Sequence, residues 1–384
     1  MREFFAIWRF ALPGFGAILV GVGMGRFAYS AMIPVMVADG WLSLPAAANV
    51  GAGNMVGYLI GALTAHRLAA FAGPVRVLRA SLMLCLGATI ACAWPWGVDW
   101  IGLWRFATGV GGALLMVIGT PILVGAAPPA RRGGVSGAIF TGVGLGMAVS
   151  GIVVPRLEGF GPAAAWLGIA GLTALAAALG WRGWPAAPAA REPARRGVVL
   201  ELPLVLLIGS YSLDAIGFMP HAIFWVDFVA RGLGRGVEAG GHQWILFGIG
   251  AAMGPLLCGR LADRIGFRRT LLAAFALKTL AVWLPLVATD QIALAVSSLV
   301  VGGLIPGIAA LTSGCALELL GPAAHGPAWR WLTIMFSLAA AAGGYLFAFV
   351  FAATGSYLAL FGLGGAIIAA GGVLAAIAAA QPRR

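Results

Sequence analysis

Charged residues are scarce in this sequence. They make up 9% of its 384 residues, whereas a water-soluble globular domain carries about a quarter. Hydrophobic residues make up 61%, and the mean hydropathy is +0.99. This composition excludes a water-soluble globular domain, so most of the chain is expected to face lipid or other apolar helices.

Cysteine and histidine are also scarce, with four of each. The cysteines lie in or beside apolar runs without the spacing of metal ligands, so we expect them to pack as small hydrophobic side chains. The histidines are scattered and form no H-E-x-x-H pair, which argues against an intramembrane metalloenzyme. We therefore expect no enzyme activity, no metal and no cofactor. These residues are Cys85, Cys92, Cys258 and Cys315, and His66, His221, His242 and His325.

The net charge of +12 comes from basic residues that punctuate apolar runs. Because they do not form a single basic patch, no nucleic-acid partner is expected. The apolar runs number twelve, and each is near the ~20 residues that span a bilayer as a helix. We predict an all-α membrane protein with twelve transmembrane helices, at residues 10–37, 45–66, 76–94, 100–126, 134–155, 163–181, 200–229, 241–260, 270–288, 292–315, 328–353 and 357–380.

The arginines predict which loops face the cytoplasm. Cytoplasmic loops of bacterial inner-membrane proteins carry an excess of Arg and Lys. With twelve helices and both termini inside, eighteen arginines fall in inside segments, while Arg156, Arg231 and Arg235 fall in outside loops. We therefore predict a multi-pass protein of the bacterial inner membrane with both termini cytoplasmic.

The longest inside stretch, residues 182–199, divides the chain near its middle. It is rich in proline and arginine, which is typical of a linker. A weak internal repeat supports two halves, because G-A-L-T-A-H at 61–66 follows the second helix as G-R-L-A-D-R at 259–264 follows the eighth. We predict pseudo-symmetric six-helix halves at residues 1–181 and 200–384.

Two motifs resemble those of the major facilitator superfamily of transporters. The run G-R-L-A-D-R-I-G-F-R-R at 259–269 is similar to the loop motif that joins helices eight and nine in that family. The run R-F-A-T-G-V-G-G-A at 105–113 fits its R-x-x-x-G-x-x-x-A pattern. Residues 21–34 within the first predicted helix and residues 214–228 within the seventh also resemble a bacterial subgroup labelled YbfB/YjiJ-type. The resemblance implies two six-helix halves with the substrate site at their interface.

The resemblance also assigns a gating role to the loop motif. Its aspartate is expected against the start of the fifth helix, near Gly134 and Val135, where the helix dipole favours a carboxylate. This chain departs from the family in its first half. It has Ala65 at the position where the family's loop motif carries an aspartate. The fifth helix lacks the proline of drug/proton antiporters, which disfavours a multidrug antiporter. The motif residues are Gly259, Asp263, Arg264, Gly266 and Arg268.

Charged residues inside the predicted spans carry the functional hypothesis, because each costs roughly 2.5–3.5 kcal/mol at a helix centre. Arg26 and Arg105 lie in the first and fourth helices, and no Asp or Glu lies within the first six. By the resemblance, helices one, four, seven and ten line the cavity, so Asp214 is expected beside both arginines in a net-positive space. Guanidinium groups bind carboxylates and phosphates, which favours an anionic substrate. In the alternative, Arg105 binds backbone carbonyls and Arg26 pairs with Asp214.

Asp214 and His221 are the candidates for proton coupling. They are seven residues apart, so they are expected to share one face of the seventh helix. In an alternative interpretation, His221 is a hydrogen-bonding residue after a kink at Pro220. Asp227 and His242 are expected in water near the outer end of the helices. Lys278 is expected to snorkel from a peripheral helix toward the inside surface, and a role in transport is the less favoured alternative.

Aromatic and amide side chains at the same depth are candidates for shaping a pocket for an organic ligand. The sequence therefore predicts a secondary-active transporter that moves a small organic anion by alternating access, coupled to protons. Its expected partners are the substrate, protons and the lipid bilayer, and it is expected to be a monomer. Efflux of drug-like or other metabolites, and a lipid flippase or sensor on the same fold, stay open as alternatives. The pocket candidates are Tyr29, Asn54, Tyr58, Phe218, Trp225 and Trp331.

Overall fold

Proline and glycine residues lie between the apolar runs, at the positions where helices begin. Pro74 stands in the first turn of its helix, where its missing N–H is not needed. Gly73 and Gly266, each directly before a helix, have φ values of 84° and 87°. Only glycine adopts this left-handed backbone at little cost. Gly73 therefore ends the helix Leu44–Ala72 before the next begins, and Gly266 does the same after Gly236–Ile265.

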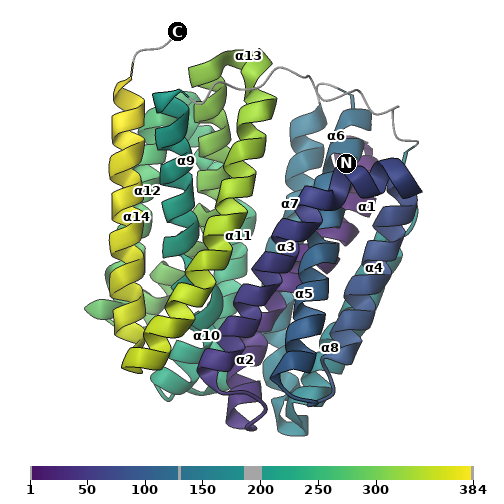
Figure 1. Cartoon of the computed structure of the whole chain (residues 1–384), viewed down its shortest axis with the longest axis vertical. Helices are drawn as coiled ribbons and strands as arrows, with labels where there is room; N and C mark the ends of the chain where they lie inside the picture. The colour runs from purple at the N-terminus through teal and green to yellow at the C-terminus, as the bar shows by residue number, and fades with distance from the viewer. Residues whose placement is uncertain (1, 129–130, 186–200, 382–384) are drawn as a thin grey trace. The chain divides into compact units, whose positions relative to one another are not determined.

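The computed structural model describes residues 2–128, 131–185 and 201–381, and this part is helical with no strand (Figure 1). Eleven of its helical stretches are long and apolar enough to cross a membrane. The all-α membrane class is therefore confirmed. Several predicted spans are close to the observed ones, and residues 357–380 coincide with the last helix. The predicted linker at 182–199 lies mostly outside the described residues.

One of the eleven stretches, Arg132–Gly180, covers two of the twelve predicted spans. It consists of α7 (Arg132–Leu157), the 3₁₀ turn η4 (Glu158–Phe160) and α8 (Gly161–Gly180). α7 and α8 have 26 and 20 residues, and α7 and α8 pack against one another. The count of twelve spans stays a prediction.

In the first part of the chain, π-helical segments interrupt two of the long helical stretches, Ala6–Ala38 and Val98–Ala126. In a π-helix the backbone hydrogen bonds span five residues instead of four. In chain order the elements before α7 are α1 (Arg2–Ile18), η1 (Leu19–Phe27, π), α2 (Ala28–Ala38), α3 (Leu44–Ala72), α4 (Pro74–Ala91), α5 (Val98–Leu114), η2 (Leu115–Gly119, π) and α6 (Thr120–Ala126).

The second part has a broken helix followed by longer ones. α13 contains a non-helical residue, Gly321, which divides it into two membrane-length stretches. The elements are α9 (Leu202–Gly217), η5 (Pro220–Phe224, π), α10 (Trp225–Asp227), η6 (Phe228–Gly232, π), α11 (Gly236–Ile265), α12 (Phe267–Trp283), η7 (Leu284–Leu286, 3₁₀), α13 (Gln291–Thr354) and α14 (Tyr357–Ala380).

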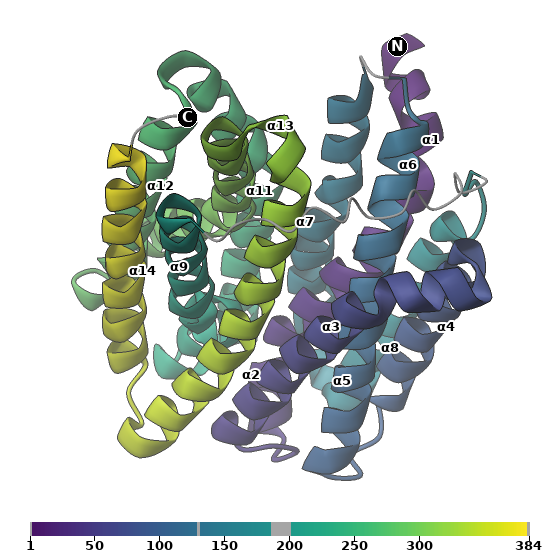
Figure 2. The ribbon, with the colours of Figure 1, turned by 45° about the horizontal axis from the view of Figure 1, so that its top comes forward.

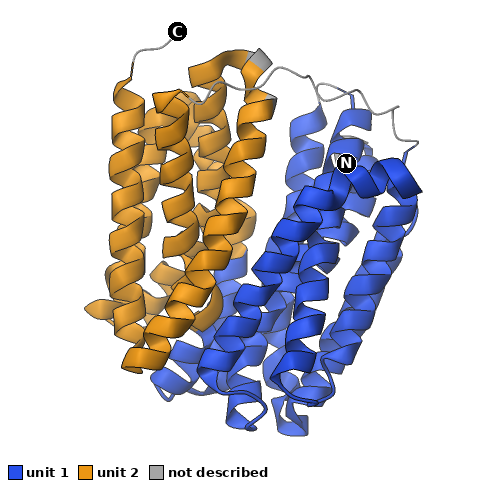
Figure 3. Ribbon diagram, in the orientation of Figure 1, with its two compact units in different colours: residues 1–192, 226–248 blue, residues 193–225, 249–384 orange. Residues whose placement is uncertain are grey.

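The chain forms two compact units (Figure 3). Residues 1–192 and 226–248 form the first, and residues 193–225 and 249–384 form the second. In the first unit α3 packs along α5, and in the second α9 packs against α13 and α14. α12 also packs against α14, and both views show α9, α12 and α14 side by side (Figures 1 and 2). This grouping reflects packing, and the two predicted six-helix halves stay a prediction.

Large apolar side chains are exposed along the helices. Phe349, Leu175 and Leu280 are 71%, 68% and 64% exposed. Such surfaces are unfavourable in water and are typical of helices that face lipid. All four cysteines are buried, as predicted. The interior also holds a small set of buried polar and charged side chains, and these define the candidate site.

Candidate functional site

In the first unit, α5 carries Arg105 into a buried position between aromatic rings. Only 1% of Arg105 is exposed. Its guanidinium carbon lies 4.6 Å from the ring centre of Tyr29 and 6.0 Å from that of Trp166. Its Nη2 donates a hydrogen bond to the backbone carbonyl of Arg26, at 3.3 Å. Arg105 therefore joins the first and fourth predicted spans through cation–π contacts and a backbone hydrogen bond.

Arg26 lies near the end of the π-helical segment η1. It is partly exposed, and its guanidinium carbon lies 4.9 Å from the ring centre of Phe27. Tyr29, one turn later, donates its hydroxyl to the carbonyl of Ala47. The two arginines thus have different surroundings, since Arg105 is enclosed and Arg26 is not.

Asn54 fixes the contact between α3 and α5. Its Nδ2 donates to the carbonyl of Arg105 at 2.7 Å and to Oγ1 of Thr108 at 2.9 Å. A Cβ atom added at Gly109 would meet the carbonyl oxygen of Asn54, so the two helices touch through backbone here. Tyr58, one turn further along α3, donates its hydroxyl to Sδ of Met116. The glycine of the R-x-x-x-G-x-x-x-A pattern is therefore needed for the close packing of α3 against α5.

In the second unit, Asp214 on α9 forms an ion pair with Lys278 on α12. Nζ of Lys278 lies 2.6 Å from Oδ1 of Asp214, and neither side chain is exposed. The second carboxylate oxygen, Oδ2, is buried without a hydrogen-bond partner among the described residues. The snorkelling prediction for Lys278 is wrong, because its stem points into the helix packing. The alternative in which Arg26 pairs with Asp214 is replaced by this pair.

His221 lies in the π-helical segment η5 and is fully buried. Its Nε2 is 2.9 Å from Oγ of Ser297, whose hydroxyl donates to the carbonyl of Ala281 at 2.7 Å. The regular helix that would give Asp214 and His221 one face ends at Gly217, so the seven-residue spacing no longer corresponds to two α-helical turns. The two residues have different hydrogen-bond partners.

Three of the aromatic candidates belong to the second unit. Phe218 is buried, and its ring centre is 5.0 Å from Nζ of Lys278. Trp225 is buried, stacks on His221 at 4.4 Å and donates Nε1 to Oγ of Ser298. Trp331 is 44% exposed. Phe218 therefore lies beside Lys278 and Trp225 beside His221, whereas Trp331 is exposed.

The loop motif connects α11 to α12 and is mostly exposed. Asp263 and Arg264 are exposed, and Gly266 forms the turn before α12. Arg268 reaches the end of α14, where Nη1 donates to the carbonyls of Ala379 and Gln381 at 2.8 and 3.2 Å. One motif arginine thus caps a helix of its own unit, while the gating role of the motif stays a prediction.

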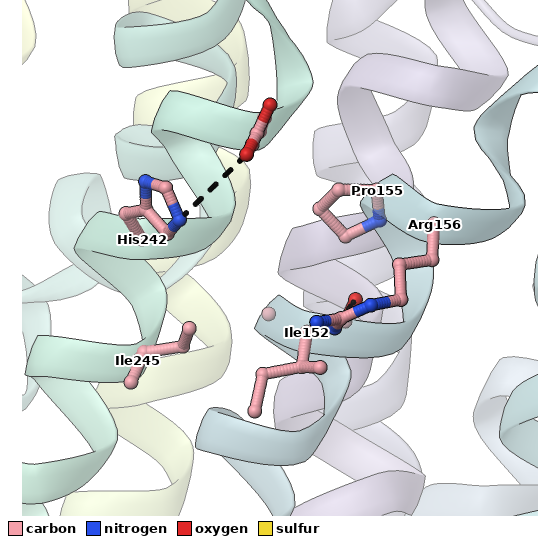
Figure 4. Close-up of a pocket in the computed structure, with 7 residues that line it drawn as sticks. Ile152, Pro155, Arg156, His242 and Ile245 are labelled. Atoms are coloured by element: carbon pink, nitrogen blue, oxygen red, sulfur yellow. Dashed lines mark hydrogen bonds and ion pairs between the residues drawn. The ribbon is translucent and has the colours of Figure 1, made fainter.

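Helix ends in the first unit form a pocket of about 280 Å³ (Figure 4). His242 and Glu238, one turn apart on α11, line one side of it, with Nε2 and Oε1 4.0 Å apart. Arg156 bonds the carbonyl of Ile152 in its own helix. The side chain of His242 is 64% exposed, as predicted. The prediction of a solvated Asp227 is wrong, because its side chain is fully buried and pairs with Arg231 at 3.1 Å.

Sequence reasoning did not find the π-helical segments. They interrupt the first, fourth and seventh predicted spans, which are three of the four expected to line the cavity. π-Helical turns are rare and often occur at functional sites. The glycine-rich run at 19–25 is the one local signal for them. Among the described residues, no group of three or more His, Cys, Asp or Glu side chains is arranged to hold a metal ion.

Comparisons with known proteins agree with this architecture. A crystal structure of a mutant of the nucleoside transporter NupG matches with a TM-score of 0.77 over 98% of this chain and 99% of that chain. The sequence identity is 13%, so the match shows the fold. The 4-hydroxybenzoate transporter PcaK of Acinetobacter baylyi (strain ATCC 33305 / BD413 / ADP1) is 28% identical over 146 residues. That match covers 38% of this chain and 32% of PcaK, about a third of its length.

A family comparison covers nearly the whole chain. The family described as "Uncharacterised MFS-type transporter YbfB" matches residues 18–376. The resemblance found in the sequence motifs is therefore confirmed. The chain belongs to this family of major facilitator superfamily transporters, which are multi-pass membrane transporters and not enzymes.

Proposed function

We propose that the protein is a secondary-active transporter that moves a small organic anion by alternating access, coupled to protons. The proposal includes twelve spans in two six-helix halves, cytoplasmic termini in the bacterial inner membrane and a monomeric state. The separation of α7 and α8 by the η4 turn supports the twelve spans. The arginine distribution supports the orientation.

The ion pair between Asp214 and Lys278 carries the proposal for an anion. Asp214 is the one acid in the interior of the predicted spans that the sequence offers to offset Arg26 and Arg105. Because Lys278 already neutralises it at 2.6 Å, its charge does not cancel theirs. A site with surplus positive charge favours a carboxylate or phosphate over a neutral ligand or a cation.

The similarity to a 4-hydroxybenzoate transporter suggests an aromatic carboxylate as the first substrate to test. Arg26 is proposed to contact the carboxylate, and Arg105 to hold Arg26 in place through its carbonyl. Tyr29, Asn54, Tyr58, Phe218, Trp225 and Trp331 are proposed to shape the organic part of the site.

Asp214 is the proposed proton-coupling residue, and His221 is the second candidate. Each has a buried proton acceptor without a hydrogen-bond partner among the described residues, Oδ2 of Asp214 and Nδ1 of His221. The contacts favour Asp214, because its carboxylate pairs with a cation, Lys278 at 2.6 Å, that a proton would release, whereas Nε2 of His221 is held by the uncharged Ser297. The loop motif from Gly259 to Arg268, including Asp263, Arg264 and Gly266, is proposed to act in gating.

Uptake into proteoliposomes tests the proposal. The purified full-length protein is given labelled 4-hydroxybenzoate, a panel of other labelled carboxylates and phosphates, and labelled uridine as a neutral compound. We expect an inward proton gradient to drive accumulation of at least one anion but not of uridine. Accumulation of uridine alone, or of no anion at all under the gradient, would refute an anion–proton transporter.

A further inference from the structure

The cation of the Asp214–Lys278 pair is a lysine, and the proposed function does not explain this choice. Lys278 is the one lysine of the sequence, while the other 23 basic residues are arginines. An ammonium group on a flexible stem is a compact point charge that can leave one partner for another. An arginine would form a wider set of fixed hydrogen bonds. Lysine therefore suits a position where the partner changes.

The surroundings of the pair are apolar. Both side chains are fully buried, and the ring of Phe218 lies 5.0 Å from Nζ. α14, which packs against α9 and α12, carries no Asp, Glu, Lys, Arg or His. The elements that pack around the pair are α9, α12, α13 and α14. Their other titratable side chains are Tyr211 on α9, Arg268 and Arg269 at the start of α12, Cys315, Glu318, His325, Arg330 and Tyr345 on α13, and Tyr357 on α14. His221, in the segment after α9, is bonded to Ser297, and Cys258 on α11 is buried.

As an ion pair, Asp214 and Lys278 carry no net charge together. Oδ1 lies 2.6 Å from Nζ, and Oδ2 has no hydrogen-bond partner among the described residues. A proton from the aqueous phase can add to Oδ2, forming an O–H bond on a carboxyl group that is then uncharged. Lys278 keeps its own protons throughout. The charge of the pair changes from zero to +1.

That positive charge is unfavourable in apolar surroundings unless an anion compensates it. A substrate anion near the released ammonium supplies the compensation. Because coupling between two bound ligands is reciprocal, the proton raises the affinity for the anion and the anion raises the affinity for the proton. The two ligands cross the membrane together when only the empty carrier and the doubly loaded carrier change between the outward-open and inward-open states.

Resting on the proposed function, we infer that Lys278 makes the transporter a one-to-one symporter. A proton on Asp214 releases Lys278, and the released ammonium favours one monovalent substrate anion. Lys278 is thus a positioning residue for coupling. The loaded carrier moves no net charge beyond that of the empty carrier, so a pH gradient drives uptake and a membrane potential does not.

Transport in proteoliposomes provides the first test, with labelled 4-hydroxybenzoate as the first probe and the carboxylate panel behind it. For wild type we expect accumulation of about tenfold for each pH unit, as one-to-one coupling requires. A potassium potential set with valinomycin should leave that ratio unchanged. A ratio that follows the potential would overturn the one-to-one symport while leaving anion transport in place.

Neutralising both partners tests whether the pair couples protons to transport or only stabilises the fold. The double variant Asp214→Asn with Lys278→Gln removes both charges and leaves no unpaired ion, so it is expected to fold. We expect it to exchange labelled for unlabelled substrate but to lose accumulation. Thr279→Val, which changes a neighbouring buried residue on α12 without a change in charge, should accumulate like wild type. Full accumulation by the double variant shows that the pair is only structural and overturns the inference, while wild-type coupling would still support the proposed function.

Thermal unfolding in detergent tests the inference without a substrate. Lys278→Gln leaves the buried carboxylate without its cation, so this variant should be more stable at pH 5, where Asp214 can take up a proton, than at pH 8. The double variant should lose this difference and match the pH profile of Thr279→Val. If Lys278→Gln has the same stability loss at both pH values, Asp214 does not take up a proton when released, and the inference is wrong.

Discussion

Arg105 holds the backbone of Arg26, with Nη2 3.3 Å from the carbonyl oxygen. The two arginines therefore form a unit in which one side chain is enclosed and the other is partly exposed. An enclosed guanidinium between Tyr29 and Trp166 orients η1. Of the two, Arg26 is the one that we propose contacts the substrate.

Arg26→Ala is expected to abolish anion uptake, because the proposed contact with the carboxylate is lost while the packing around Arg105 stays. The protein should keep its thermal midpoint in detergent. Arg76→Ala is the matched control, since Arg76 is exposed. Normal uptake of every transported anion by Arg26→Ala would remove Arg26 from the binding site.

Arg105→Lys is expected to raise KM about tenfold or more with a smaller change in the maximal rate. Lysine keeps the charge but lacks the planar group that spans two rings and a carbonyl, and misplacement of Arg26 weakens binding. Exposed cation–π contacts are worth about 0.5–1 kcal/mol and buried ones about 2 kcal/mol, so the fold should survive. An unchanged KM would show that Arg105 does not position the site.

Gly109→Ala is expected to lower the free energy of unfolding by about 1–3 kcal/mol, the usual cost of overpacking. The new Cβ would meet the backbone of Asn54 and lie 2.9 Å from the amide nitrogen of Tyr58, so α3 and α5 must move apart. Gly87→Ala is the control, because nothing lies within 4 Å of its added Cβ. Its stability should stay the same or rise slightly, since alanine favours a helix. Equal effects of the two changes would contradict backbone contact at Gly109.

Arg268→Ala is expected to loosen the last turn of α14. The side chain supplies charged hydrogen bonds to two carbonyls at a helix C-terminus, Ala379 and Gln381, and such bonds are worth about 1.5–3 kcal/mol. Hydrogen exchange should become faster at the end of α14 and stay unchanged in α9. Arg269→Ala provides the control, because Arg269 is exposed. Identical exchange in the two variants would show that Arg268 is no cap.

The sequence predicted what depends on local composition. Helix extents follow from apolar length, so residues 328–353 and 357–380 were found within one residue of Pro327–Thr354 and Tyr357–Ala380. The pair of Asp214 and Lys278 joins residues 64 positions apart, and no local pattern indicates which face of α12 meets α9. Asp227 was wrongly predicted in water for a similar reason, since π-helical turns on both sides of it change the direction of its side chain.

The bond between His221 and Ser297 provides the last prediction. A hydroxyl has one proton, and Ser297 uses it on the carbonyl of Ala281. His221 must therefore donate from Nε2, which makes its Nδ1 an acceptor, and Nδ1 is buried without a hydrogen-bond partner among the described residues. A second proton on this ring would add a charge between Trp225 and Phe361.

His221→Gln separates hydrogen bonding from proton transfer, because its amide can donate to Ser297 but does not titrate. We expect it to keep the pH-driven accumulation ratio of wild type, with at most a severalfold slower rate. His221→Phe removes the N–H that donates to Oγ of Ser297 and leaves that buried oxygen without this hydrogen bond. The thermal midpoint of this variant should therefore be lower. The accumulation ratio is the deciding measurement, because it depends on coupling and not on the amount of active protein. If His221→Gln still exchanges substrate but no longer accumulates it, His221 carries the proton together with Asp214.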